Sequence, residues 1–90
     1  NQRYTEAITN LGNAVKYYKN MDQAYYTIGM SYWQQNKLEP AMLNFAKAYI
    51  LKGSVSASAK KYLDQLWKSG HRNSLVGQER VIERARQDLK

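Results

Sequence analysis

Ninety residues suffice for one small domain but not for two, and a content of 43% hydrophobic and 23% charged residues is typical of a globular chain. The absence of cysteine excludes a disulfide-stapled scaffold and thiolate metal sites. No apolar run approaches the roughly 20 residues that span a membrane, and no signal peptide opens the visible chain. Together these absences favour a cytoplasmic protein.

The net charge is +7, and most of it lies in the second half of the chain. Residues 1–51 hold five Lys or Arg against three Asp or Glu, whereas residues 52–90 hold nine against four. A basic surface attracts acidic peptides, anionic lipid or nucleic acid through its long-range field. Charge alone therefore leaves three classes of partner open.

The chain is predicted to be all-α, because helix-forming residues are common, Pro occurs once and no β-rich run is present. Short breaks separate the helical stretches, and short links make consecutive helices pack as antiparallel hairpins. The breaks carry helix start and stop residues, namely Asn20 or Asp22, Pro40, Gly53, Ser54 or Ser56, Gly70 and Ser74. Five helices are expected, at 3–18, 22–35, 38–51, 55–69 and 75–89.

The second stretch is apolar on two sides. One stripe is Tyr25, Ile28, Gly29 and Tyr32, and the other is Gln23, Tyr26, Met30 and Trp33. Both have the spacing of a helix face, so this helix is expected to be buried on two sides. A Gly inside a helix costs about 1 kcal/mol relative to Ala, which indicates that Gly29 is needed for another reason.

The third stretch supplies that reason. Its apolar stripe alternates small and aromatic residues: Ala41, Phe45, Ala48 and Tyr49. Where two antiparallel helices cross closely, one must lack a side chain and the other must be small. We therefore expect Gly29 and Ala41 to meet at such a crossing.

This spacing resembles the tetratricopeptide repeat (TPR), whose 34-residue pattern is W-x2-L-G-x2-Y, then A-x3-F, then P. The matching residues are Tyr25, Ile28, Gly29, Tyr32, Ala41, Phe45 and Ala48, and the sequence departs from the pattern in having Tyr25, Ile28 and Gly53 for its Trp, Leu and Pro. A step of 34 residues backwards lands on Ala7, Leu11 and Ala14, and a step forwards on Ala59, Tyr62, Leu63 and Leu66.

The resemblance implies one TPR-like domain over 1–90, a right-handed α-α superhelix of antiparallel hairpins. Residues 22–53 would form a complete repeat, preceded by the second helix of a partial repeat at 3–18. The first helix of a following repeat would lie at 55–69, and 75–89 would form a degenerate second helix or a cap. About three stacked repeats are usually needed for stability, so the chain is expected to be a fragment of a larger TPR protein or to self-associate.

The family binds peptides and proteins, and the first helix of each repeat lines its concave surface. The resemblance therefore implies a protein–protein interaction scaffold, with a partner that carries an apolar anchor and acidic groups. The implied concave residues are Gln23, Tyr26, Met30, Trp33, Gln34, Lys60, Lys61, Asp64, Trp67 and Lys68. A Lys and Asn clamp for a terminal carboxylate is not expected, because Lys60 is the only one of these residues that suits such a clamp.

Other interpretations of the same residues stay open. The stripe could be covered by Val81, Ile82 and Leu89 of the last helix, or by a second copy of the chain. A structural oligomerisation module would pair through the exposed helix at 3–18. The eight Tyr and the basic charge also allow a nucleic-acid-binding helical domain, although most of these Tyr occupy expected core positions.

Enzymatic activity and cofactors are not expected. His71 is the only histidine and falls in a predicted loop, so it supports neither a common metal site nor a Ser–His–acid arrangement. Glu79 and Glu83 share a helix face with several Arg, which is typical of a salt-bridged surface. No Gly-rich phosphate loop is present.

Overall fold

The computed structural model describes residues 2–17, 21–70 and 77–89, and these residues form helices joined by short connections. The prediction of an all-α chain with five helices is confirmed, and the described residues contain no strand. None of the helices within the described ranges is long and apolar enough to cross a membrane. The helices are α1 (Gln2–Tyr17), α2 (Asp22–Gln34), α3 (Leu38–Ile50), α4 (Ser56–Gly70) and α5 (Gln78–Asp88).

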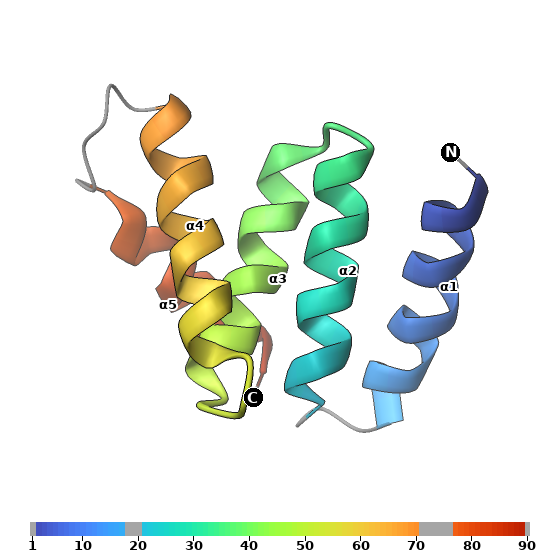
Figure 1. Cartoon of the computed structure of the whole chain (residues 1–90). Coiled ribbons are helices and arrows are strands. Elements are labelled where there is room, and N and C mark those ends of the chain that lie inside the picture. The colour runs from blue at the N-terminus through green and yellow to red at the C-terminus, as the bar shows by residue number, and fades with distance from the viewer. Residues whose placement is uncertain (1, 18–20, 71–76, 90) are drawn as a thin grey trace.

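The first four helices lie in chain order with alternating direction (Figure 1). Helix α1 packs against α2, α2 against α3, and α3 against α4. Helix α5 also packs against α3, so α3 has three neighbours and is the centre of the domain.

The α2–α3 turn is built by a left-handed residue. Asn36 has a φ of 61°, which Asn tolerates better than most side chains do. The N–H of Lys37 then donates to the carbonyl of Tyr32 at 2.9 Å, closing the end of α2. Pro40 is the third residue of α3, as expected for a first helical turn, where a missing N–H leaves no bond unmade.

The α3–α4 connection differs from the sequence-based expectation. The residue with a positive φ is Lys52, at 55°, rather than Gly53. Gly53 instead lies directly against the side chain of Asp22, so that a Cβ atom at this position would overlap the Asp22 carboxylate. The close approach of the Asp22 side chain, and not a left-handed backbone conformation at the end of α3, therefore accounts for the glycine.

The core is centred on α3, which contributes four residues that are fully buried: Ala41, Phe45, Ala46 and Ala48. From α4, Ala59 and Leu63 are equally inaccessible, and α2 adds Tyr25 and Ile28. Tyr32 is half-buried and packs against this cluster. The small residues of α3 let its neighbours approach closely, while Phe45 fills the space between them.

The last helix begins later than expected, at Gln78 rather than at 75. Gly77 precedes it with a φ of 93°, and a Cβ there would lie 3.1 Å from Cζ2 of Trp67. This position therefore requires glycine both for its conformation and for its contact. The predicted caps Asn20 and Ser74, and the loop residue His71, lie outside the described residues.

Candidate functional site

Four aromatic rings from three helices meet beside α2. The ring centroid of Trp33 lies 5.3 Å from that of Tyr62, and the centroid of Tyr26 lies 5.8 Å from that of Phe45. Tyr62 also lies 6.2 Å from Tyr26 and 5.8 Å from Phe45. Phe45 is fully buried, whereas the other three rings are half-buried and reach the surface.

Helical periodicity positions these side chains. Tyr26 and Trp33 are seven residues apart, which is close to two turns, so both project from the same side of α2. Met30 lies between them along the helix and is also half-buried. Tyr62 approaches from α4. We refer to Tyr26, Met30, Trp33 and Tyr62 as the aromatic face.

Tyr62 influences the ionisation of its neighbour Tyr26. Burial, followed by the neighbouring Tyr62 hydroxyl, raises the pKa of Tyr26 above its ordinary value. Near neutral pH, Tyr26 is therefore a phenol that can donate and accept hydrogen bonds. An aromatic surface with polar tips can hold an apolar group and a polar group of one ligand.

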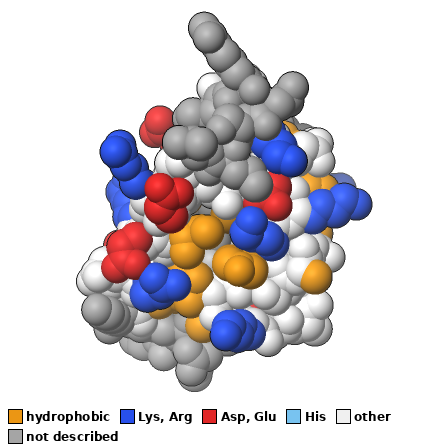
Figure 2. All heavy atoms as spheres, turned by 90° about the vertical axis from the view of Figure 1, so that its left-hand side faces the viewer, with side chains coloured by type: hydrophobic (Ala, Val, Ile, Leu, Met, Phe, Trp, Pro, Cys, Tyr) orange, Lys and Arg blue, Asp and Glu red, His pale blue; other side chains and the backbone are white. Residues whose placement is uncertain are grey.

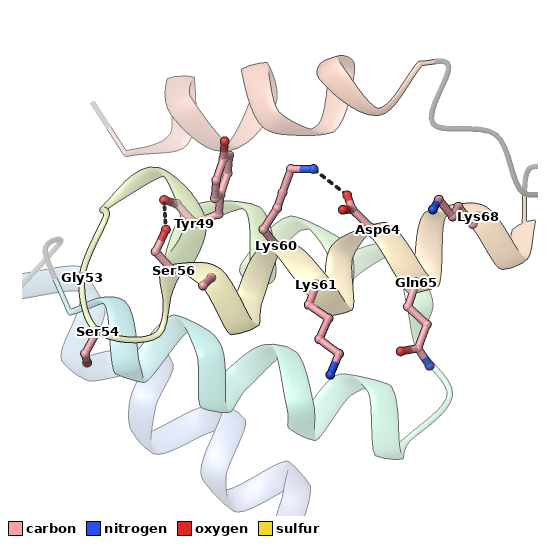
Figure 3. A pocket seen from close by; sticks show the side chains of 10 residues that line it. Tyr49, Gly53, Ser54, Ser56, Lys60, Lys61, Asp64, Gln65 and Lys68 are labelled. Carbon is pink, nitrogen blue, oxygen red and sulfur yellow. Dashed lines mark hydrogen bonds and ion pairs between the residues drawn. The ribbon is translucent and has the colours of Figure 1, made fainter.

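The polar residues expected beside this face are found at its edges. Gln23 Nε2 donates to Ser54 Oγ at 3.3 Å, and Gln34 is exposed near the other end of α2. Lys61 and Gln65 extend from α4 on the side of α2 (Figure 3). Both are exposed, so Lys61 places a positive charge near the aromatic face.

Other residues of the expected set lie on a different side of α4. Lys60 and Asp64 form an ion pair of 2.6 Å, and Gln78 of α5 donates to the same carboxylate oxygen at 2.6 Å. Burial alone would raise the pKa of Asp64. The hydrogen bonds from Gln78 and Lys60, with the charges of Lys60 and Lys68, outweigh it and hold that pKa below its ordinary value.

Trp67 does not join the aromatic face. It is buried, with 8% of its surface exposed, and Gly77 packs on its ring. Gly77 and Gln78, at the beginning of α5, therefore cover part of the α4 stripe at Trp67 and Asp64. Val81, Ile82 and Leu89, which the sequence suggested as a cover for the stripe, pack against the core cluster. The expected concave residues therefore do not form one surface. Some lie on α2 or on the side of α4 that faces α2, and the others lie on the side of α4 that faces α5.

A shallow hollow of about 1030 Å³ lies along the outer surface of α4. Lys60, Lys61 and Lys68 line it together with hydroxyls from the α3–α4 connection (Figure 3). Figure 2 shows the side of the molecule on which α4 and α5 lie. Hydrophobic side chains gather near the middle of this view, and charged side chains of both signs surround them. Among the described residues, no cluster of three or more His, Cys, Asp or Glu could hold a metal ion.

Sequence reasoning missed Tyr62 and Gln65 as neighbours of this site. Tyr62 lies one 34-residue repeat after the core position Ile28, so it was expected only in the core. Its ring does pack on Phe45, yet it also reaches the surface between Tyr26 and Trp33. A signal was present, because a Tyr at an apolar core position brings a hydroxyl that needs water or a partner.

Comparison with known protein families, curated proteins and solved structures finds no match to this chain.

Proposed function

We propose that this chain is a TPR-like helical repeat domain that binds a peptide or partner protein through the aromatic face. It would act as a non-enzymatic scaffold within a larger repeat protein. The observation that carries this proposal is the set of half-buried rings of Tyr26, Trp33 and Tyr62, drawn from two helices and open to the surface. Trp and Tyr, together with Arg, are the residue types enriched among the energetic hot spots of interfaces.

The packing beneath the face supports the repeat interpretation. A Cβ on Gly29 would lie 3.0 Å from the ring of Phe45 and 3.2 Å from the carbonyl oxygen of Ala41. This is the close crossing expected from the TPR-like spacing. It also holds α2 rigidly against α3, so that a ligand would meet a preformed surface and lose little affinity to reorganisation.

The chemistry of the face indicates the kind of partner. Tyr26, Met30 and Trp33 offer apolar contact area, and Lys61 adds a positive charge at the edge. An apolar side chain of the partner would lie against Trp33, and acidic residues beside it would be attracted by Lys61. Charge at the rim would speed association more than it would strengthen the complex.

The test is a screen of a peptide library against the domain, followed by binding measurements with the enriched peptides. Acidic sequences with one apolar residue should be enriched. Trp33→Ala should weaken binding by about 2 kcal/mol if Trp33 is a hot spot. Unchanged affinity of this variant, or peptides that map away from α2 and α4, would refute the assignment.

Two neighbouring lysines give a matched control. Lys61 extends on the side of α2, whereas Lys60 is paired with Asp64 on the other side of the same helix. Lys61→Ala should lower the association rate and its salt dependence, and Lys60→Ala should change neither. Equal effects of the two variants would mean that only the net charge of the domain matters.

A second candidate function is self-association through α1. None of the residues described at positions 3–16 is fully buried, and the apolar ones, such as Tyr4, Ile8 and Leu11, are half-buried. Among the helices of the described residues, α1 packs to a substantial extent only on α2. Its remaining apolar surface would be covered in a longer array or by a second copy.

A further inference from the structure

A second apolar depression lies on the α5 side of the domain, away from the aromatic face. Its volume is about 520 Å³, and α3, α4 and α5 all contribute to it. Met42 and Trp67 are buried at its base, each with 8% of its surface exposed, and Leu43 and Val81 are half-buried beside them. We refer to this depression as the α3–α5 groove.

The α5 edge of the groove carries two arginines. Arg80 and Arg84 are four residues apart and therefore lie one above the other along the helix. Both are exposed, and neither forms an ion pair with any residue in the described ranges. The arrangement differs from that of Arg86, which is paired with Glu83 at 2.7 Å.

The first turn of α3 also lines the groove, with Glu39 and Pro40. The groove therefore combines an apolar base with two positive charges from α5 and one negative charge from α3. A bound segment matching this pattern would have an apolar side toward Met42 and Trp67 and acidic side chains toward α5.

We propose that the α3–α5 groove binds an acidic amphipathic helix of a partner protein. One apolar side chain of that helix lies over Met42, Trp67 and Val81. Two carboxylates one turn apart pair with Arg80 and Arg84, which offer planar forks suited to bidentate hydrogen bonds. Groove binding of this kind uses anchors that repeat at the spacing of a helix face. The site shares no residue with the aromatic face and does not depend on its function.

Fluorescence anisotropy tests the charge requirement. The probe is a fluorescein-labelled helical peptide with leucines on one face and glutamates spaced four apart, compared with the same peptide carrying lysines instead. The double variant Arg80→Glu/Arg84→Glu should bind the glutamate peptide at least about ten-fold more weakly, the equivalent of one lost charged contact. It should gain affinity for the lysine peptide, because the charges are reversed on both sides.

The control variant is Lys16→Glu/Lys37→Glu, which makes the same change in net charge on exposed residues outside both the groove and the aromatic face. This variant should bind the glutamate peptide within a few-fold of the parent. Equal losses in the two double variants would overturn the proposal, since binding would then follow net charge alone. Failure of the parent to bind the glutamate peptide would overturn it as well.

Tryptophan fluorescence locates the bound peptide, because the chain has two Trp residues and each belongs to a different surface. Trp33→Phe leaves Trp67 in the groove as the single reporter, and Trp67→Phe leaves Trp33 on the aromatic face. An unlabelled glutamate peptide should shift the emission of Trp67 and leave that of Trp33 unchanged. The reverse result would refute the groove while supporting the aromatic face. Sedimentation in which peptide displaces a dimer would instead assign the groove to a second copy.

Discussion

Gly29 of α2 and Phe45 of α3 are so close that any side chain on Gly29 would press on the aromatic ring. A Cβ built on Gly29 would lie 3.0 Å from both Cδ1 and Cε1 of Phe45. Phe45 is fully buried, and the carbonyl oxygen of Ala41 lies 3.2 Å from the same position, so a side chain there would have to displace closely packed atoms. Gly29 therefore lowers the helix propensity of α2 but permits a tight α2–α3 crossing.

Substitution of Gly29 should destabilise the domain. Gly29→Leu should lower the free energy of unfolding by at least about 1–3 kcal/mol, because overpacking forces the two helices apart. Gly29→Ala should also be destabilising even though Ala is the better helix former. Urea denaturation followed by circular dichroism gives the measurement. An unchanged midpoint for the Leu variant would disprove the close-crossing explanation.

Gly12 offers the matched control for this substitution. It also lies inside a helix, yet a Cβ there would meet no atom within 4 Å. Gly12→Ala should therefore stabilise the domain by up to about 1 kcal/mol, the ordinary difference in helix propensity. The opposite signs expected at Gly12 and Gly29 separate propensity from packing.

Gly53 should tolerate alanine better than Gly29 does, although it lies closer to its neighbour. The atom in the way is a carboxylate oxygen at the end of the Asp22 side chain, and this oxygen is buried without a hydrogen-bond partner among the described residues. Rotation of Asp22 would relieve the overlap and hydrate the oxygen. Gly53→Ala should therefore change stability by less than about 1 kcal/mol.

A double-mutant cycle checks this explanation for Gly53. Asp22→Ala removes the obstructing carboxylate, so the effect of Gly53→Ala should then become more favourable than in the parent chain. Additive effects of the two substitutions would show that the two side chains do not interact. A loss as large as that of Gly29→Leu would show that Asp22 cannot rotate.

The helices could be predicted from the sequence because their information is local. The 3.6-residue periodicity around Tyr25 and Phe45, and the breaks near Asn36 and Gly53, place four connected helices within one or two residues of their observed bounds. Gly29 could be explained from the sequence as well, because close helix crossings favour a small residue at a fixed spacing. That reasoning failed at Gly53, where the contact is with Asp22 in a distant part of the sequence.

The candidate site was harder to predict for a related reason. Periodicity places Tyr26, Met30 and Trp33 on one side of α2, and the structure brings Tyr62 to them. Trp67 and Asp64 of α4 are contacted by Gly77 and Gln78, which follow a stretch of sequence with no repeat-like spacing. The sequence therefore could not show that Trp67 would be covered by Gly77 or that Arg80 and Arg84 would edge a groove.

Acid should weaken the link between α4 and α5 through Asp64. The pKa of its carboxyl is held below the ordinary value of about 3.9, so the unfolded chain binds this proton more readily than the folded domain does. The stabilisation is fully present above that ordinary value and is lost as the pH falls through the folded-state pKa. Asp64→Asn should therefore show a smaller loss of stability than the parent does as the pH falls below about 4.

Urea midpoints measured across this range test the effect. Gln78→Leu, which removes one of the two hydrogen bonds to the carboxylate, should flatten the profile in the same window. If the parent and Asp64→Asn gave parallel profiles, Asp64 would contribute nothing to the pH dependence. Loss of the α5 helical signal before the rest of the domain would place the change at the α4–α5 contact.

The apolar side of α1 should bring two copies of the chain together at high concentration. Ala7 and Ala14 lie seven residues apart on one side of the helix and are only half-buried. Ala7→Glu/Ala14→Glu would place two like charges in that surface and should keep the domain monomeric. Thr9→Glu/Asn13→Glu makes the same charge change on the exposed polar side and should leave association intact. Sedimentation equilibrium over a range of concentrations gives the comparison. A parent chain that stays monomeric throughout would contradict self-association, and would favour a longer array as the natural cover of α1.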